Sequence, residues 1–156
     1  MINPFEHKGK TYNVEIGRDE CQEAPWEGGQ CLAGTVSKWE TRDKNSCERI
    51  LASDTRGGVK LFYDFQHAVR TLRAEGLSGE DADTSANREF EFLRGYATDE
   101  WTYVYVRVAE MREDEDGYEY EGPFECLGGI ESNSGEYLDE VAHELIAEIE
   151  AEQRDD

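Results

Sequence analysis

The chain has 156 residues, with 37 acidic side chains against 16 basic ones and a net charge of −21. This length is sufficient for one domain with its own core, and 6 Phe, 8 Tyr and 3 Trp distinguish the chain from disordered acidic sequences. The negative charge argues against direct binding to nucleic-acid phosphates and against attachment to anionic membranes. No long apolar run and no hydrophobic leader are present, so we expect a soluble, cytoplasmic protein.

The first third of the chain is predicted to consist of strands and loops. Apolar and polar residues alternate from Tyr12 to Ile16, which is the period of a half-buried strand. In chain order, we predict a strand over residues 11–16, a long loop over 17–34, and short strands over 34–39 and 48–52.

Helical spacing follows in the middle of the chain. A first helix is predicted to begin at Leu61 and to end at Gly76, with an apolar stripe of Phe62, Phe65, Val69 and Leu72. A second helix is predicted to begin between Ser78 and Thr84, with Ala86, Phe90, Leu93 and Ala97 facing inward.

The last third is predicted to be a hairpin followed by a helix. A strand opens at Trp101, with Thr102, Val104, Val106 and Val108 on one face and Tyr103, Tyr105 and Arg107 on the other. Asp116-Gly117 predicts the turn, and residues 118–124 the returning strand. The final helix is predicted over residues 134–152, with an apolar face of Leu138, Val141, Ala142, Leu145 and Ile149.

This order of elements favours the α+β class over an alternating parallel sheet. We expect a single domain over residues 1–156, with a mainly antiparallel sheet and about three helices packed on one face. Residues 1–10 and 153–156 are expected to be flexible.

The acidic residues are concentrated near the end of the chain, where residues 110–156 hold 18 acidic and 2 basic side chains. Like charges four residues apart on a helix destabilise it slightly, so such residues either aid solubility or face a basic partner. Their spacing is also close to that of neighbouring phosphates on a nucleic-acid strand. The candidate contact carboxylates are Glu119, Glu121, Glu136, Asp139, Glu140 and Glu144.

Tyrosines of the hairpin are the second group of candidate contact residues. Tyr103, Tyr105, Tyr118 and Tyr120 fall on the two predicted strands, and some of them should share one face. An exposed tyrosine beside carboxylates suits a protein contact, because its ring buries a large area at low entropic cost. The alternative is that a helix covers this face and the rings belong to the core.

No catalytic or metal-binding motif emerges from the sequence, and no catalytic residue or cofactor is expected. The four cysteines contain no Cys-x-x-Cys pair, so free, buried thiols are expected. A zinc site formed by Cys21, Cys31 and Cys47 with a histidine stays open as an alternative.

Several segments resemble an uncharacterised family of small acidic proteins encoded by bacteriophages and prophages. The resemblance covers most of the chain from about residue 34 onward, and its motifs are not catalytic. The similar segments are Gly34–Trp39, Phe62–Phe65, Phe90–Val108, Gly129–Ser132 and Tyr137–Ala142. The resemblance implies a phage origin and little about chemistry.

Charge and resemblance together predict a non-enzymatic protein that acts in the cytoplasm of a host cell. We expect it to bind and inhibit a basic host protein of a nucleic-acid-targeting defence system, of the anti-restriction or anti-CRISPR type, by imitating DNA. One alternative is a small phage enzyme, or a cofactor- or metal-binding protein. Another is an oligomeric scaffold, such as a homodimer joined through the hairpin, with an acidic face that is merely solvated.

Overall fold

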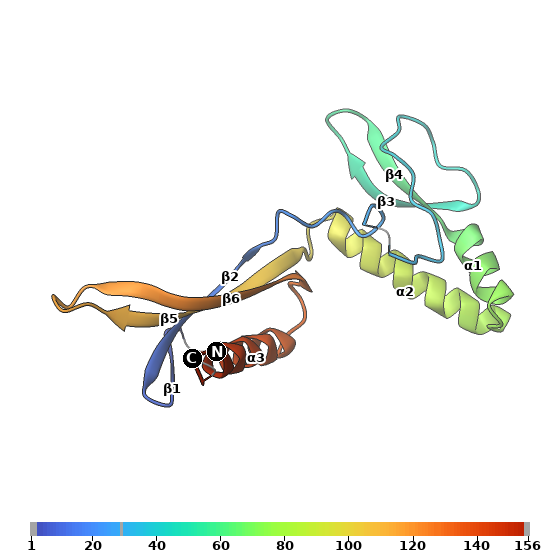
Figure 1. Ribbon diagram of the computed structural model, residues 1–156. Helices are drawn as coiled ribbons and strands as arrows, with labels where there is room; N and C mark the ends of the chain where they lie inside the picture. The colour runs from blue at the N-terminus through green and yellow to red at the C-terminus, as the bar shows by residue number, and fades with distance from the viewer. Residues whose placement is uncertain (1–2, 29, 155–156) are drawn as a thin grey trace. The chain divides into compact units, whose positions relative to one another are not determined.

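The computed structural model describes residues 3–28 and 30–154 and confirms the α+β class (Figure 1). Its strands are β1 (Phe5–His7), β2 (Lys10–Arg18), β3 (Glu48–Asp54), β4 (Val59–Asp64), β5 (Tyr103–Glu113) and β6 (Glu119–Glu131). Its helices are α1 (Phe65–Ala74), α2 (Gly79–Ala97) and α3 (Tyr137–Arg154). None of the described helices combines the length and the apolar character needed to cross a membrane.

The chain forms two compact units. Unit 1 consists of Met1–Gln22 and Thr102–Asp156, and unit 2 of Glu23–Trp101. The expectation of one domain over residues 1–156 stays a prediction.

Unit 1 is an antiparallel sheet in the order β1-β2-β5-β6, with α3 packed against β5 and β6 (Figure 1). Its core joins apolar residues of three strands to the buried stripe of α3. The strands contribute Tyr12, Val104, Val106, Val108 and Ile130, and α3 contributes Val141, Ala142, Leu145, Ile146 and Ile149. The apolar face predicted for the last helix is therefore the face that packs on the sheet.

The register assigns each side chain of β5 to one face of this sheet. Val106 lies between its partners Ile16 and Leu127 and faces α3. Arg107 lies between Glu15 and Cys126 and faces away from the helix. The alternation predicted from Trp101 onward is confirmed. We name the side without α3 the open face.

The hairpin turn forms where Asp116-Gly117 predicts it. Gly117 has a φ of +84°, a conformation that other residues rarely adopt. The carboxylate of Asp114 accepts hydrogen bonds from the backbone N–H groups of Asp116 and Tyr118, at 2.9 and 2.8 Å. The returning strand is longer than predicted, because β6 continues beyond residue 124 to Glu131.

The chain ends take part in unit 1. Residues 5–7, expected to be flexible, form β1 and pair with β2. Gln153 and Arg154, also expected to be flexible, lie in α3, and Gln153 hydrogen-bonds to Glu110 and Lys10. The expectation for residues 1–2 and 155–156 lies outside the described residues.

Unit 2 packs α1 and α2 against the two-stranded sheet of β3 and β4. The prediction that a helix begins at Leu61 is wrong, because Val59–Asp64 form β4. Leu61, Phe62 and Tyr63 are buried in succession, as in a strand covered on both faces, whereas a helical stripe buries every third or fourth residue. The helix begins only at Phe65, after Asp64 caps it by accepting the N–H of His67 at 2.9 Å.

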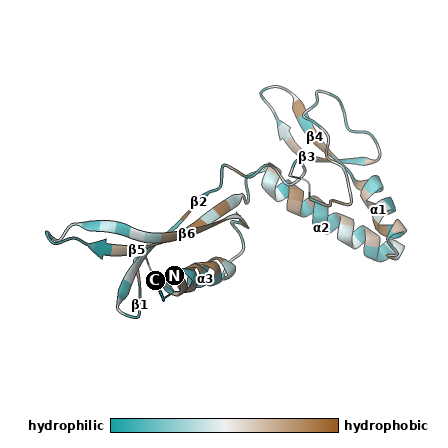
Figure 2. Cartoon of the chain, in the orientation of Figure 1, coloured by the Kyte–Doolittle hydropathy of each residue, from teal (hydrophilic) through white to brown (hydrophobic). Residues whose placement is uncertain are grey.

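The strand predicted over residues 34–39 is also wrong. Only single bridges form there and just after it, between Val36 and Tyr63 and between Glu40 and Lys60. The second helix is confirmed, because the hydroxyl of Ser78 accepts the N–H of Asp81 at 3.1 Å and α2 begins at Gly79. Figure 2 shows hydrophobic and hydrophilic residues alternating in bands along α2. Of the four residues predicted to face inward, Ala86, Phe90 and Leu93 are buried.

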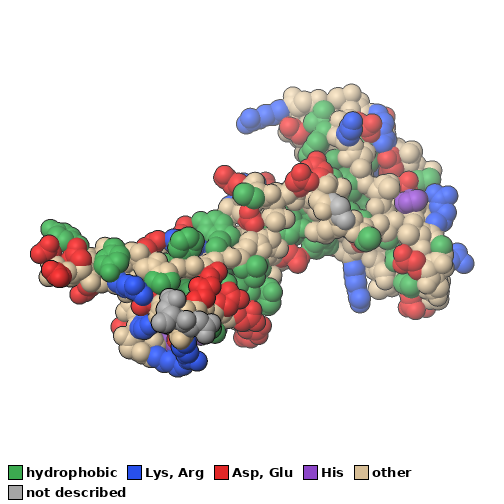
Figure 3. Space-filling model, in the orientation of Figure 1, with side chains coloured by type: hydrophobic (Ala, Val, Ile, Leu, Met, Phe, Trp, Pro, Cys, Tyr) green, Lys and Arg blue, Asp and Glu red, His purple; other side chains and the backbone are tan. Residues whose placement is uncertain are grey.

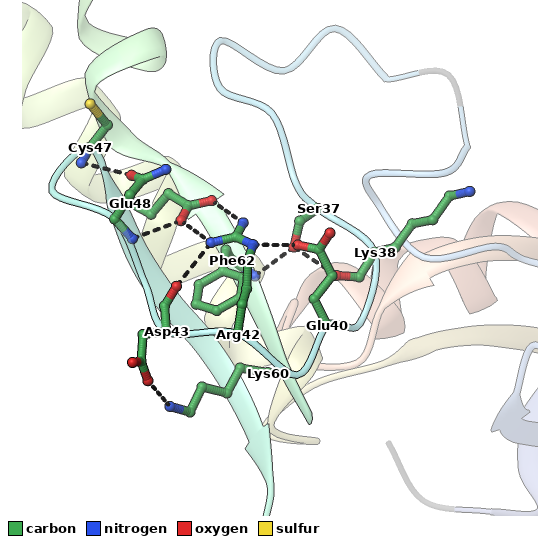
Figure 4. Close-up of polar contacts among 10 residues, drawn as sticks. Ser37, Lys38, Glu40, Arg42, Asp43, Cys47, Glu48, Lys60 and Phe62 are labelled. Atoms are coloured by element: carbon green, nitrogen blue, oxygen red, sulfur yellow. Dashed lines mark hydrogen bonds and ion pairs between the residues drawn. The ribbon is translucent and has the colours of Figure 1, made fainter. Parts of the chain in front are cut away.

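The polar stretch before β3 is held by one arginine. Both terminal nitrogens of Arg42 donate to Glu48 at 2.7 Å, and its Nε donates to Glu40 at 2.8 Å (Figure 4). The guanidinium also lies 4.1 Å from the centre of the Phe62 ring. This pairing lowers the pKa of the Glu48 carboxyl group, chiefly through its hydrogen bond to Arg42.

A half-buried carboxylate joins α2 to the loop before β3. Glu89 accepts hydrogen bonds from the backbone N–H groups of Ala33 and Gly34, at 2.8 and 3.0 Å. Its second oxygen also accepts the hydroxyl of Tyr63 at 2.5 Å. Burial, followed by the hydrogen bond to Glu89, raises the pKa of Tyr63. One side chain therefore satisfies three donors from two segments.

We predict that Glu89→Ala destabilises unit 2, because it leaves two backbone donors and a buried hydroxyl without their acceptor. The expected loss in the free energy of unfolding is about 2–3 kcal/mol, measured by urea denaturation. Glu91→Ala is the matched control on the same helix, where an exposed carboxylate pairs with Arg94, and should cost less than about 0.5 kcal/mol. Equal losses in the two variants would contradict the role of Glu89.

Candidate protein-interaction surface

The acidic charge of the molecule is concentrated in unit 1. Unit 1 holds 22 acidic and 6 basic side chains, whereas unit 2 holds 15 and 10. Figure 3 shows acidic side chains gathered over α3 and at the β5–β6 hairpin. Unit 1 therefore accounts for 16 of the 21 net negative charges of the chain.

The two candidate carboxylates of the hairpin lie on the open face of the sheet. Glu119 lies opposite Glu113 of β5, and Glu121 lies opposite Met111. The side chains of Glu119 and Glu121 are on the side of the sheet away from α3. Arg107 donates two hydrogen bonds to Glu121, at 3.0 and 2.6 Å, and this pairing lowers the pKa of Glu121. Glu121 is thus already neutralised within the protein.

The other four candidate carboxylates belong to α3 or its approach. Glu136 directly precedes the helix, and Glu140 and Glu144 are exposed on it. Asp139 is half-buried and lines a cavity with Val14 and other residues of the β2 side. The six predicted carboxylates therefore occupy both faces of the sheet and do not form one surface.

The four candidate tyrosines differ in exposure. Tyr103 is buried, at 5% exposed, which removes it from any contact surface. Tyr105 is half-buried on the open face, where its hydroxyl donates to Glu15 at 2.8 Å. Tyr118 and Tyr120 are exposed, at 72% and 48%, and only these two rings are available to a partner.

One row of glutamates on α3 lies beside β6. Glu144, Glu148 and Glu152 are spaced by four residues, so they lie about 6 Å apart along one flank of the helix. Glu152 and Glu148 lie close enough to Glu125 of β6 to raise the pKa of its carboxyl group. We name these four residues the acidic strip.

The acidic strip is not balanced by basic side chains. In the part of the chain that the structure describes, no lysine or arginine forms an ion pair with Glu144, Glu148 or Glu152. The hydrogen bond to Glu152, and then the charges of Glu152 and Glu148, raise the pKa of Glu125. The folded protein therefore holds repelling carboxylates together at neutral pH.

Exposed apolar side chains accompany the acidic strip along β6. Phe124 is 57% exposed and Leu127 is 42% exposed, and Tyr120 precedes them on the same strand. Most protein contacts combine such apolar anchors with charged surroundings. The outer side of β6 thus carries both components of a protein-binding surface.

A cavity with a volume of about 570 Å³ lies at the β1–β2 turn of unit 1. Its lining includes Lys10, Thr11, Arg112, Glu113 and Glu119, but no serine, histidine or cysteine. Among the described residues, no group of three His, Cys, Asp or Glu side chains is placed to hold a metal ion.

The expectation of buried thiols is wrong for most of the cysteines. Cys21, Cys31 and Cys126 are exposed and Cys47 is half-buried, and all four are free. Cys21 and Cys31 lie outside helices and strands, and Cys126 lies on the open face of the edge strand β6, so no other described element covers these side chains.

Comparison of the sequence with protein-family models finds no match. Comparisons with curated proteins and with solved structures find no match either.

We predict that Glu125→Gln stabilises the protein at neutral pH. The raised pKa of Glu125 means that the folded state holds a proton at a pH where the unfolded chain has lost it, so acidification below neutral pH stabilises this site. The glutamine amide keeps a donor for Glu152 without the charge. The melting temperature should therefore rise at pH 7, and its dependence on pH over this range should weaken.

Glu121→Gln is the control on the same strand, and it should lower the melting temperature at pH 7. It removes the partner of Arg107, whose stabilising effect is present at neutral pH and is lost as the pH falls through the lowered pKa of Glu121. A fall in melting temperature for Glu125→Gln at pH 7 would contradict the repulsion inferred for the acidic strip.

Proposed function

We propose that this chain is a non-enzymatic interaction protein that binds and inhibits a basic, nucleic-acid-binding protein through its acidic strip. The observation that carries the proposal is the gathering of glutamates from α3 and β6, where Glu148 and Glu152 raise the pKa of Glu125, in a unit with few basic groups. Such a surface stores repulsion that a positively charged partner relieves on binding.

The geometry suits a partner whose natural ligand is a phosphate backbone. The strip places carboxylates about 6 Å apart along α3 and adds Glu125 from β6, so negative charge recurs at intervals comparable to those of phosphates. A basic groove that binds DNA would accept the strip in place of DNA. Association would be fast and would weaken with salt.

The resemblance to phage-encoded acidic proteins supports the choice of partner. A phage protein of this charge that acts in the host cytoplasm gains from blocking restriction enzymes or RNA-guided nucleases. The proposed partner class is therefore a basic effector of a host defence system, bound without direct contact to nucleic acid.

We predict that the triple variant Glu144→Lys, Glu148→Lys, Glu152→Lys loses this inhibition. The test adds the purified protein to a panel of restriction enzymes and RNA-guided nucleases and measures their binding to labelled DNA. The natural sequence should compete with DNA for at least one effector, more weakly at 0.5 M than at 0.1 M salt, whereas the triple variant should lose at least about 100-fold in affinity.

The control variant makes the same change in charge in unit 2. Glu23→Lys, Glu27→Lys and Glu75→Lys reverse three exposed carboxylates there and should leave inhibition within about threefold of the natural protein. Circular dichroism checks that both variants keep their helices. Full inhibition by a folded strip variant, or equal losses in both variants, would contradict the assignment of the strip.

A further inference from the structure

The two edges of the unit 1 sheet differ sharply. At one edge β1 has 3 residues, whereas β6 at the other edge has 13. A long unpaired edge offers backbone N–H and C=O groups to another strand, and proteins usually shorten or cover such edges. In the described part of the chain, no segment other than β5 hydrogen-bonds to the backbone of residues 124–127.

Residues 124–127 form the regular part of this edge. The pairing with β5 is continuous from Phe124 to Leu127, and register shifts interrupt it on both sides. Gly129, within the second shift, already donates its N–H to Asp19 at 2.7 Å. A segment added at residues 124–127 would therefore meet a regular strand with a free outer edge.

The side chains along this stretch separate by face. Glu125 and Leu127 lie on the α3 side, and Phe124 and Cys126 on the open face. Glu148 and Glu152 flank Glu125 on the α3 side. Residues of an added strand would alternate in the same way, so one set would meet carboxylates and the other the exposed ring of Phe124.

Charge decides which occupant fits this edge. A second copy of the chain would bring another set of glutamates against Glu125, Glu148 and Glu152, and like charges at these distances repel. A strand with lysine or arginine at alternate positions would instead neutralise the strip. The carboxylates thus act against self-pairing and favour a basic strand.

We propose that the outer edge of β6 at residues 124–127 binds an extended basic segment of a partner protein, which adds a strand to the sheet with basic and apolar residues in alternation. This inference rests on the proposed function and deepens it, since it states how the partner binds. Main-chain hydrogen bonds to β6 supply register, the acidic strip selects the basic side chains, and Phe124 receives the apolar ones.

Synthetic peptides test the inference without altering the protein. The probe is a nine-residue peptide of alternating lysine and valine, and its dissociation constant is measured by fluorescence anisotropy at 0.1 M salt. Two versions carry N-methyl groups on alternate residues, one set for each edge of the peptide strand, so they keep the charge but block one edge. A further peptide has the same composition, with all lysines placed before all valines.

The alternating peptide should bind, and its amide contacts should slow hydrogen exchange at residues 124–127. At least one N-methylated version should bind at least about tenfold more weakly than the alternating peptide. The peptide with all lysines before all valines should lose at least the same factor in affinity. Equal binding by all the lysine peptides, or no protection of residues 124–127, would overturn strand addition. Dimerisation of the free protein through β6 would also overturn it.

The peptide test of strand addition can fail or succeed independently of the inhibition test of the proposed function. Inhibition of a DNA-binding effector that depends on Glu144, Glu148 and Glu152, together with equal binding of all the lysine peptides, would leave the proposed function standing and remove strand addition alone. Edge-specific peptide binding without inhibition of any effector in the panel would support strand addition and remove the proposed class of partner.

Discussion

The packing of α3 on the four-stranded sheet is the contact on which the rest of unit 1 depends. Five buried apolar residues of the helix meet the central strands, and their burial contributes on the order of 10 kcal/mol before conformational entropy is subtracted. Repulsion among glutamates spaced by four costs only a few tenths of a kcal/mol for each exposed pair. The apolar contact therefore holds the acidic strip in place against its own repulsion.

The same packing decides which carboxylates are exposed together. Once the apolar stripe of α3 faces the sheet, one flank of the helix has to lie beside β6, where Glu148 and Glu152 approach Glu125. On the opposite flank His143 makes an edge-to-face contact with Phe5, and Glu150 pairs with Lys8. Among the described residues, one flank thus meets basic groups at the end of β1 and in the following turn, whereas the other flank, beside β6, does not.

Unit 2 uses its carboxylates for a different purpose. Glu89 binds two backbone N–H groups and the hydroxyl of Tyr63, and Glu48 binds Arg42. Each of these acidic side chains fastens a segment that lacks regular secondary structure. The same residue type therefore fastens internal structure where donors surround it, whereas at the α3 positions of the acidic strip it stays exposed and unpaired with any described basic group.

The sequence by itself determined the features that depend on local periodicity and turn chemistry. The alternation after Trp101, the Asp116-Gly117 turn and the stripe of α3 each follow from residues close in the chain. The four-residue spacing from Glu144 to Glu152 was also present in the sequence, so the helical half of the acidic strip was readable there.

Only the tertiary structure decided the remaining features, because they depend on residues far apart in the chain. Leu61 to Tyr63 form a strand because partners cover both of its faces, and no local pattern distinguishes such a run from a buried helix. Arg107 pairs with Glu121 across the hairpin, and the register turns Glu125 toward α3, and neither partner is close in the chain. A strand's pairing and a carboxylate's partner are set by packing across the sheet, and this packing is fixed only when the whole chain folds.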